Sequence, residues 1–407
     1  MLMQPSPLRP PWVRTLWVMV AVQFVMSLGV TVFTPILPLF LPELGVTSIA
    51  GIDFWSGLIA AVTPLVAAFA SPVWGALGDR YGRKSMVLRA SAAISLFTLL
   101  MAFSTQAWHL FTLRAVLGIF AGFSATAVAL VATEIPEDKL GWGLGWLSTG
   151  QLVGSLAGPL CGGLVADLAH DLRAVFYWTS ALSALALVMT WLFVADPPFH
   201  HEERRPVASV RAGIRLVAGS APLLSLVFVL LFSQFSIRTI QPLITVFVQE
   251  LVGPIPALAT MAGLAFSVTG VSDLLFSPFL GKRSDVIGYR KVLLLSLFCA
   301  ALISLPQAFV HNYWWFLGER FALGMFLGGI VPTANALLGR LVEPGRRGFI
   351  YGVTSTAFFL GNFLGPITGG SLAAGLGIRP LFIIAAGLFL ATFAWVLVAV
   401  PKDQPAE

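Results

Sequence analysis

Long apolar runs without a charged residue limit this chain to one class of fold. Two of the clearest are Leu182 to Val194 and Val292 to Val310, and basic or turn residues flank each of them. Such runs approach the ~20 residues that an α-helix needs to cross ~30 Å of hydrocarbon. Only 10% of the residues are charged, whereas a soluble domain needs roughly 25% to cover its surface. No segment shows the alternation over ~10 residues that indicates a membrane barrel, so the sequence predicts an all-α membrane protein.

The breaks between apolar runs, which carry charges or Pro and Gly, predict twelve transmembrane helices. Their approximate ranges are 15–41, 54–78, 86–104, 109–132, 142–166, 174–194, 222–249, 257–280, 292–310, 314–339, 348–374 and 380–400. Because this number is even, both termini are expected on the same side of the membrane.

The basic residues lie almost entirely on one side of these spans. Of the 24 Lys and Arg residues, only Arg173 and Arg379 fall in segments on the side opposite the termini, and Arg114, Arg238 and Arg320 fall within spans. Cytoplasmic loops of membrane proteins carry such an excess of positive charge. We therefore expect a multi-pass protein of the bacterial inner membrane with both termini in the cytoplasm. Topology also explains the sequence pI near 9.7 better than binding to nucleic acid does.

One long polar segment divides the chain near its midpoint. Residues 195–221 separate the sixth and seventh predicted spans, so we expect an N-terminal six-helix half at 1–194, a cytoplasmic linker at 195–221 and a C-terminal six-helix half at 222–407. The linker contains a His-His-Glu-Glu run at 200–203, which a solvated segment explains better than a metal site. The two cysteines lie in apolar runs without the spacing of metal ligands, so no metal site is predicted.

The two halves contain the same features at a nearly constant offset. Four features recur 206 or 207 residues further along the chain: GALGDRYGRKSMVL from Gly75 as GKRSDVIGYRKVLL from Gly281, Arg114 and Gly118 as Arg320 and Gly324, GSLAGPLCGG from Gly154 as GNFLGPITGG from Gly361, and Pro35 as Pro242. Internal repeats on this scale are typical of secondary transporters, whose binding site lies near the membrane midplane between the repeats. The sequence therefore predicts two pseudo-symmetric halves of six helices.

Four motifs resemble those of the major facilitator superfamily, and in particular of its twelve-helix drug:proton antiporter family. They are LGVTVFTPILP from Leu28 in helix 1, GALGDRYGRK from Gly75 between helices 2 and 3, Leu110 with Arg114 and Gly118 in helix 4, and GSLAGPLCGG from Gly154 in helix 5. The resemblance covers the whole chain and is strongest to the MdtG-like multidrug exporters. Leu117 departs from the pattern, because the family usually has Gln there, and Ser284 and Val286 replace the usual residues beside Asp285.

The resemblance implies the major facilitator fold and a proton-coupled antiporter that exports small amphipathic compounds by alternating access. The proton gradient would supply the energy, so no cofactor is expected. The expected partners are a small amphipathic substrate and membrane lipid, with no nucleic acid, and the chain is expected to be a monomer. A proton symporter importing a small nutrient, or a transporter that flips lipids, would use the same fold. An enzyme is not expected, because the five histidines lie at span ends or in loops and form no catalytic constellation.

The loop after the second span combines one acidic residue with several basic ones. The resemblance implies that its carboxylate holds one conformation through contacts with helix 11, in a latch that comprises Asp79, Arg80, Arg83, Lys84 and, in the second-half copy, Asp285. A carboxylate at a helix end can interact with the N-terminal dipole of a neighbouring helix. The basic residues, taken singly, are better explained as topology signals.

Small residues recur at helical spacing in the fifth span and in its copy. They form a flat stripe on which another backbone can approach closely, and each stripe contains a proline that favours a bend. The residues are Gly154, Gly158, Pro159 and Gly162, and Gly361, Gly365, Pro366 and Gly369. The motif suits a helix that rocks against its partner, although plain close packing would produce the same pattern.

Charged residues within spans are the strongest candidates for the mechanism. Each costs at least ~2.5–3.5 kcal/mol at mid-bilayer, so each should be paired or hydrated. Five qualify, namely Arg114, Arg238, Asp273, Glu319 and Arg320. Their depths make Arg238 and Glu319 plausible partners and leave Asp273 without a basic partner, which suits a proton carrier. We therefore expect proton coupling to involve Asp273, Glu319, Arg114 and Arg320, and the net charge of +1 favours neutral, zwitterionic or anionic substrates.

Helices 3, 6, 9 and 12 contain no interior charge, which agrees with the family arrangement in which they face lipid. Aromatic residues on other helices could line an apolar pocket beside Arg238. The candidates are Phe33, Phe120, Phe123, Phe235 and Phe358. With 32 phenylalanines in the chain, most must face lipid or lie in the core.

Overall fold

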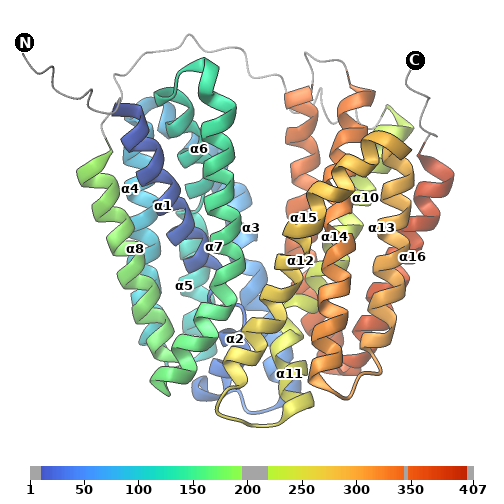
Figure 1. Ribbon diagram of the computed structural model, residues 1–407. Helices are drawn as coiled ribbons and strands as arrows, with labels where there is room; N and C mark the ends of the chain where they lie inside the picture. Colours follow the sequence, from blue (N-terminus) through green and yellow to red (C-terminus); the bar gives the residue numbers. More distant parts are fainter. Residues whose placement is uncertain (1–10, 195–218, 343–346, 401–407) are drawn as a thin grey trace, which may run out of the picture.

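A computed structural model describes residues 11–194, 219–342 and 347–400. Every regular element in these residues is a helix, so the predicted all-α fold is confirmed (Figure 1). The elements of the first half are α1 (Pro11–Thr31), α2 (Ile36–Phe40), η1 (Leu41–Leu44), α3 (Ile49–Tyr81), α4 (Arg83–Ala102), α5 (Ala107–Ile119), α6 (Phe123–Glu134), η2 (Glu137–Lys139), α7 (Leu140–Ala169) and α8 (Arg173–Phe193). Those of the second half are α10 (Ala221–Ile240), η3 (Gln241–Leu243), α11 (Ile244–Val252), α12 (Leu258–Ile287), α13 (Tyr289–Gln307), α14 (Tyr313–Leu341), α15 (Arg347–Leu376) and α16 (Arg379–Ala399).

These helices form twelve crossings of the molecule. Within the described residues, eleven stretches are long and apolar enough to span a membrane, if α5–α6 and α10–α11 each count as one. The twelfth is α15, a 30-residue helix that packs between α3 and α10. Figure 1 shows two bundles, α1–α8 and α10–α16, with both chain ends at the same end of the molecule. We call this the terminal end. The expected linker at 195–221 lies outside the described residues except for its last three.

Three predicted spans are interrupted in the structure. The first and seventh were expected to run unbroken over 15–41 and 222–249, but α1 ends at Thr31 before Pro35, and α10 ends at Ile240 before Pro242. Proline has no N–H to continue a helix, and its ring collides with the preceding turn. Because Pro35 and Pro242 are repeat equivalents, both halves bend at the same place.

The fourth span breaks between α5 and α6, where Gly122 adopts a left-handed φ of 108°. The break removes hydrogen bonds from the carbonyl groups that end α5. Side chains of neighbouring helices replace them: Arg89 Nη2 donates to the carbonyls of Phe120 and Ala121 at 3.3 and 3.4 Å, and Trp74 Nε1 donates to that of Ile119. The helix break is therefore a fixed part of the first half.

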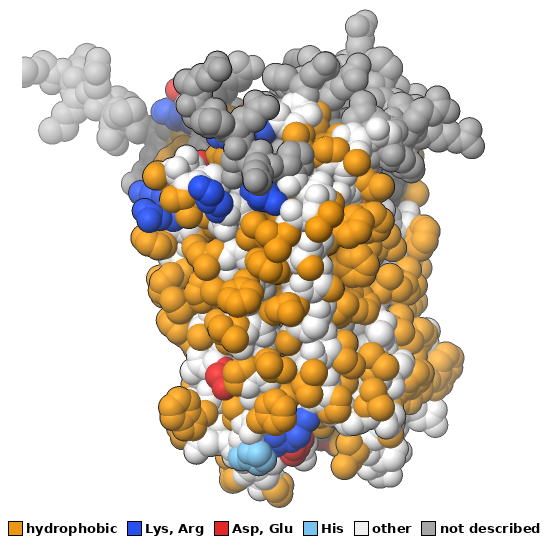
Figure 2. All heavy atoms as spheres, turned by 90° about the vertical axis from the view of Figure 1, so that its right-hand side faces the viewer, with side chains coloured by type: hydrophobic (Ala, Val, Ile, Leu, Met, Phe, Trp, Pro, Cys, Tyr) orange, Lys and Arg blue, Asp and Glu red, His pale blue; other side chains and the backbone are white. Residues whose placement is uncertain are grey.

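The outer surface matches a membrane environment. Large apolar side chains are exposed along the third, sixth, ninth and twelfth spans (α4, α8, α13 and α16), for example Leu96, Leu192, Leu302 and Val398. Figure 2, which views the second half, shows a broad apolar band with Lys and Arg side chains gathered toward the terminal end. The chain is a multi-pass membrane protein.

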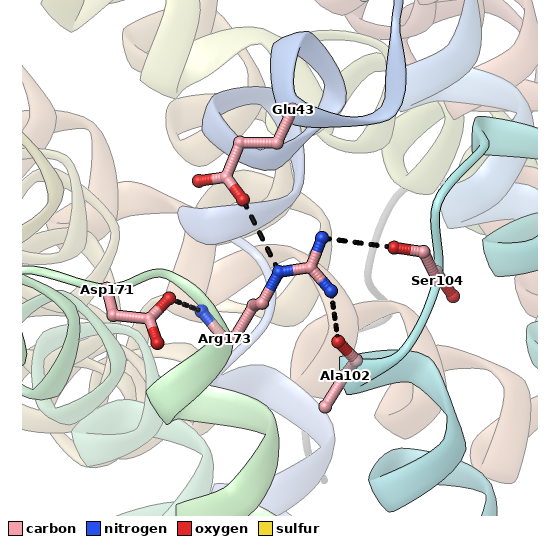
Figure 3. Close-up of polar contacts among 5 residues, drawn as sticks. All are labelled: Glu43, Ala102, Ser104, Asp171 and Arg173. Carbon is pink, nitrogen blue, oxygen red and sulfur yellow. Dashed lines mark hydrogen bonds and ion pairs between the residues drawn. The ribbon is translucent and has the colours of Figure 1, made fainter.

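Arginines tie together the ends of helices at the other end of the molecule. In the first half, Arg173 at the start of α8 donates to the carbonyl oxygens of Ala102 and, at 3.2 Å, Ser104, which end α4 (Figure 3). Its Nε lies 3.6 Å from Glu43 Oε2 on η1, and its guanidinium lies over the ring of Phe40. One guanidinium thus joins three helical segments.

The second half repeats this arrangement. Arg379 Nη1 donates to the carbonyls of Ala308 and Val310 at 3.0 and 2.9 Å, and its Nε lies 2.8 Å from Glu250 Oε1. The guanidinium lies over Phe247. Each residue is 206 or 207 positions after its equivalent in the first half. Arg173 and Arg379, the two basic residues on the side opposite the termini, therefore clamp helix ends together. This role was not predicted from the sequence, although the two arginines are repeat equivalents.

We expect Arg379→Ala and Arg173→Ala each to lower the free energy of unfolding by about 1.5–3 kcal/mol, because each removes charged hydrogen bonds to helix-end carbonyls. The ion pairs should contribute only ~0–1 kcal/mol, since they are partly exposed. Burial raises the pKa of Glu43, and Arg173 opposes that rise. Glu43→Gln should therefore change the free energy of unfolding very little. Thermal unfolding of the detergent-solubilised variants measures these differences. Arginine-to-alanine variants as stable as the parent would contradict the clamp.

Candidate functional site

The two arginines of the fourth and tenth spans occupy equivalent positions. Arg114 on α5 donates from Nε to Thr63 Oγ1 on α3 at 3.4 Å, and the Thr63 hydroxyl donates to the Arg114 carbonyl at 3.0 Å. Arg320 on α14 is 9% exposed, and its Nε donates to the carbonyl of Ala265 on α12 at 3.5 Å. Both side chains therefore contact the second membrane span of their own half, which is α3 for Arg114 and α12 for Arg320.

Asp273 lies on α12 against the backbone of α14. A Cβ added at Gly328 would lie 2.6 Å from Asp273 Oδ1, so the glycine makes room for the carboxylate. Within the described residues Asp273 forms no ion pair, and its side chain is half-buried. A carboxylate in this position can gain or lose a proton without breaking an existing ion pair.

The expected pairing of Arg238 with Glu319 is wrong. Arg238 Nη1 donates instead to Gln241 Oε1 on η3, because the break after α10 turns that glutamine back toward it. Arg238 Nε and Glu319 Oε2 are both buried and have no hydrogen-bond partner in the described structure. Arg238 Nε can thus donate to a bound molecule, and Glu319 Oε2 can accept from one or bind a proton.

A sixth charged residue lies within a span and was missed by sequence reasoning. Asp53 on α3 is only 1% exposed, and its Oδ1 has no hydrogen-bond partner in the described structure. The predicted span began at 54, whereas α3 begins at Ile49 after Ser48, whose side chain accepts from the Gly51 N–H. This N-cap signal, Ser before an apolar run, would have placed Asp53 inside the helix.

The glycine stripes pack within each half. Cβ atoms at Gly154, Gly158 and Gly162 would lie 2.1–2.4 Å from atoms of α1 or of Val32, the residue after it. Those at Gly361, Gly365 and Gly369 would lie 1.9–2.8 Å from atoms of α10. Of the two alternatives, close packing is therefore what the glycines provide in this conformation. The prolines of the motifs face the other half, since the carbonyls of Pro159 and Pro366 lie where Cβ atoms at Gly263 and Gly57 would be.

The two halves meet along two helix pairs, α3 with α15 and α7 with α12. Four other glycines bring the backbones together, and their added Cβ atoms would lie 2.2–2.5 Å from carbonyl oxygens of the opposite half: Gly57, Gly163, Gly263 and Gly370. All four lie in the parts of these helices remote from the chain termini. We call this part of the molecule the closed end, and Figure 1 shows the bundles diverging from it toward the terminal end.

Hydrogen bonds reinforce the α7–α12 pair. Asp167 Oδ2 on α7 accepts from the backbone N–H of Thr260 at 2.7 Å and from its hydroxyl. Thr260 lies in the first turn of α12, where a carboxylate interacts favourably with the helix dipole. The Ser267 hydroxyl also donates to the carbonyl of Leu156 at 2.7 Å. The α3–α15 pair has the unpartnered Asp53 instead.

The latch residues lie in several places. The side chains of Asp79 and Arg80 are outside the described part of the chain, as are those at the start of α15 that they would contact. Arg83 Nη1 donates to the carbonyl of Ala129 on α6 at 2.6 Å, within the first half. Lys84 lies in the first turn of α4, and Asp285 accepts from the hydroxyl of Tyr289. The latch stays a prediction.

Two of the aromatic candidates are core residues. Phe33 is 6% exposed and stacks on Phe176, because the break after α1 turns it toward α8. Phe123 is also 6% exposed and lies in the core of the first half. Both side chains are thus buried in this conformation, and the expectation that they line a pocket stays a prediction.

The other aromatic candidates are less buried. Phe120 stacks on Trp74 and contacts the ring of Phe97 in a tilted arrangement. Phe235 and Phe358 are half-buried. Within the described residues, no group of three His, Cys, Asp or Glu side chains could hold a metal ion.

Comparisons with known proteins agree with this architecture. The model of the Major Facilitator Superfamily matches residues 19–254 and again 226–407. Multidrug resistance protein MdtG of Salmonella arizonae is 36% identical over 395 residues, which cover 97% of each chain, and the protein of that name from Salmonella typhimurium is equally similar.

Solved structures share the fold at low sequence identity. A bacterial homologue of the human lysosomal transporter Spinster, in an inward-facing and occupied conformation, has a TM-score of 0.76 at 16% identity, covering 94% of this chain and 96% of that one. A mutant form of the nucleoside transporter NupG has a TM-score of 0.76 at 13% identity, with coverages of 95% and 99%.

Proposed function

This chain belongs to the major facilitator superfamily of transporters, and on that premise we propose that it exports small amphipathic compounds from the cytoplasm in exchange for protons. The relatives that support this proposal are named as multidrug resistance proteins and match over 97% of both chains. With both termini in the cytoplasm, as the charge bias predicts, the closed end faces outward. The conformation described above would then be the one that accepts substrate from the cytoplasm.

The single observation that carries alternating access is the placement of the contacts between the halves. The glycine contacts and the Asp167–Thr260 hydrogen bonds between the halves lie at one end. Within each half, by contrast, the helices are held together by the glycine stripes and the arginine clamps. In the first half, hydrogen bonds from Arg89 and Trp74 to the break between α5 and α6 add to them. Two rigid bodies that meet at one end can exchange that contact for one at the other end by rocking around a central site.

Proton coupling requires a carboxylate that can be charged in one state and neutral in another. Among the described spans, Asp273 meets this requirement best, since it has no ion pair and packs against a neighbouring helix at Gly328. Arg114 and Arg320 would provide fixed positive charge within the spans. We propose amphipathic substrates, and the expected preference for neutral, zwitterionic or anionic ones stays a prediction.

Transport into everted membrane vesicles tests the exchange directly. Vesicles that contain the protein should accumulate a fluorescent amphiphile when the lumen is acidic, and a protonophore should abolish the accumulation. Vesicles without the protein are the control. Accumulation that persists without a gradient would favour lipid or amphiphile flipping, and gradient-driven uptake into intact cells would favour a nutrient symporter.

A further inference from the structure

Asp53 is a buried carboxyl at a contact that must separate if the halves rock. It is 1% exposed, and its own carbonyl oxygen lies 2.5 Å from where a Cβ at Gly370 of the other half would be. One turn further along α3, Gly57 makes the corresponding approach to Pro366. Asp53 therefore lies at the contact that is lost whenever α3 and α15 part.

The equivalent contact, between α7 and α12, contains a carboxylate that accepts hydrogen bonds. Asp53 corresponds to Ala259 at the offset of 206, and beside Ala259 the residue Thr260 donates two hydrogen bonds to Asp167. Asp167 can thus remain charged while the closed end is closed. The Oδ1 atom of Asp53 has no such donor in the described structure, and a buried carboxylate without a partner is strongly disfavoured relative to the neutral acid.

Charged neighbours do not compensate Asp53. The described side chains of α15, η3 and α2 include no ionisable group. On η1, Glu43 pairs with Arg173. On α5, His109 lies beside Thr105 and Arg114 contacts Thr63, while the basic residues of α4 lie in its first turns at the terminal end. Arg238, on α10 just before η3, donates to Gln241.

We propose that Asp53 is a proton-binding gate: its carboxyl is protonated while the closed end is closed, and releases that proton to water when α3 and α15 separate. On opening, the O–H bond breaks, the proton passes to water at that end and the hydrated carboxylate remains. Re-closure needs a proton from the same side. This inference rests on the proposed alternating-access function. With such a gate, an acidic exterior would favour the conformation that accepts substrate from the cytoplasm.

The sign of the pH effect follows from this linkage. The closed state holds one proton more than the open state, so raising the pH shifts the equilibrium toward opening, by up to about tenfold per pH unit. Asp53→Asn mimics the neutral acid and should remove this dependence. Asp167→Asn should weaken closure at every pH and keep the dependence, because Asp53 remains.

Distances between spin labels at the closed end test the gate without any substrate. Ile49 and Leu376 are exposed, at the start of α3 and the end of α15, and labelled cysteines there, in a chain with Cys161 and Cys299 replaced by alanine, report their separation in nanodiscs. Between pH about 5 and about 9, a range in which a hydrated Asp with its ordinary pKa of about 4 is charged, the long-distance population should grow in the parent and stay constant in Asp53→Asn. Asp53→Ala serves as a second neutral variant if the amide variant does not fold.

A parent whose distances ignore pH, or neutral variants that keep the parent's pH dependence, would overturn the gate. These outcomes are distinct from failure of the proposed function. A protein that shows the pH-dependent distances but no gradient-driven export would retain the gate and lose the antiport.

Discussion

Gly57→Ala is expected to abolish transport while leaving each half folded. The new Cβ would lie 2.2 Å from the carbonyl oxygen of Pro366 and 3.0 Å from the Cα of Gly370. Both neighbours are backbone atoms of the other half, so neither can rotate away. Overpacking typically costs ~1–3 kcal/mol and occasionally more, and every 1.4 kcal/mol is about tenfold in an equilibrium. The ratio of open to closed molecules at the closed end should therefore rise by about 10- to 100-fold. The protein should then no longer alternate between its two conformations.

Two further glycine variants show whether this effect belongs to the contact between halves. Gly369→Ala, one residue before Gly370, would place its Cβ 1.9 Å from the Thr239 carbonyl within the second half, so it should lower thermal stability. Gly387→Ala on α16 has no atom within 4 Å of its Cβ and should change neither property. Transport in vesicles and thermal unfolding, measured on all three variants, separate the two effects. Full transport in Gly57→Ala would show that closure at this contact is not needed.

Asp273→Asn is expected to eliminate gradient-driven export and to leave substrate binding largely intact. The amide matches the carboxyl in size, so its packing against Gly328 is retained, but it cannot exchange a proton in the physiological range. Export should fall to the level of vesicles without the protein, whereas fluorescence titration of the purified variant should give a dissociation constant within about threefold of the parent, a difference below 1 kcal/mol.

Glu319→Gln is the matched comparison for Asp273→Asn. Its Oε2 is also buried without a hydrogen-bond partner in the described residues, but it lies on α14 rather than α12. Normal export by Asp273→Asn together with loss in Glu319→Gln would move the proton site to α14. Loss in both variants would indicate that the two carboxylates act together.

Much of the architecture was determined by the sequence alone. Runs such as Val292 to Val310 must form helices, because the bilayer core offers backbone groups no other hydrogen-bond partner. The constant offset of the repeat identified two equivalent halves, and Pro35 and Pro242 marked the places where their first helices bend. The sequence also indicated that Asp273 lacks a basic partner.

Only the tertiary structure decided which faces meet. In a membrane the lipid is as apolar as the protein core, so the pattern of apolar residues does not mark the buried side of a helix. Sequence periodicity therefore could not show that Gly154 packs within its half and Gly163 against the other. Nor could it show that Arg173 and Arg379 clamp helix ends, or that Asp53 becomes buried. Each depends on how helices distant in sequence are rotated against one another, and close backbone approach fixes that rotation.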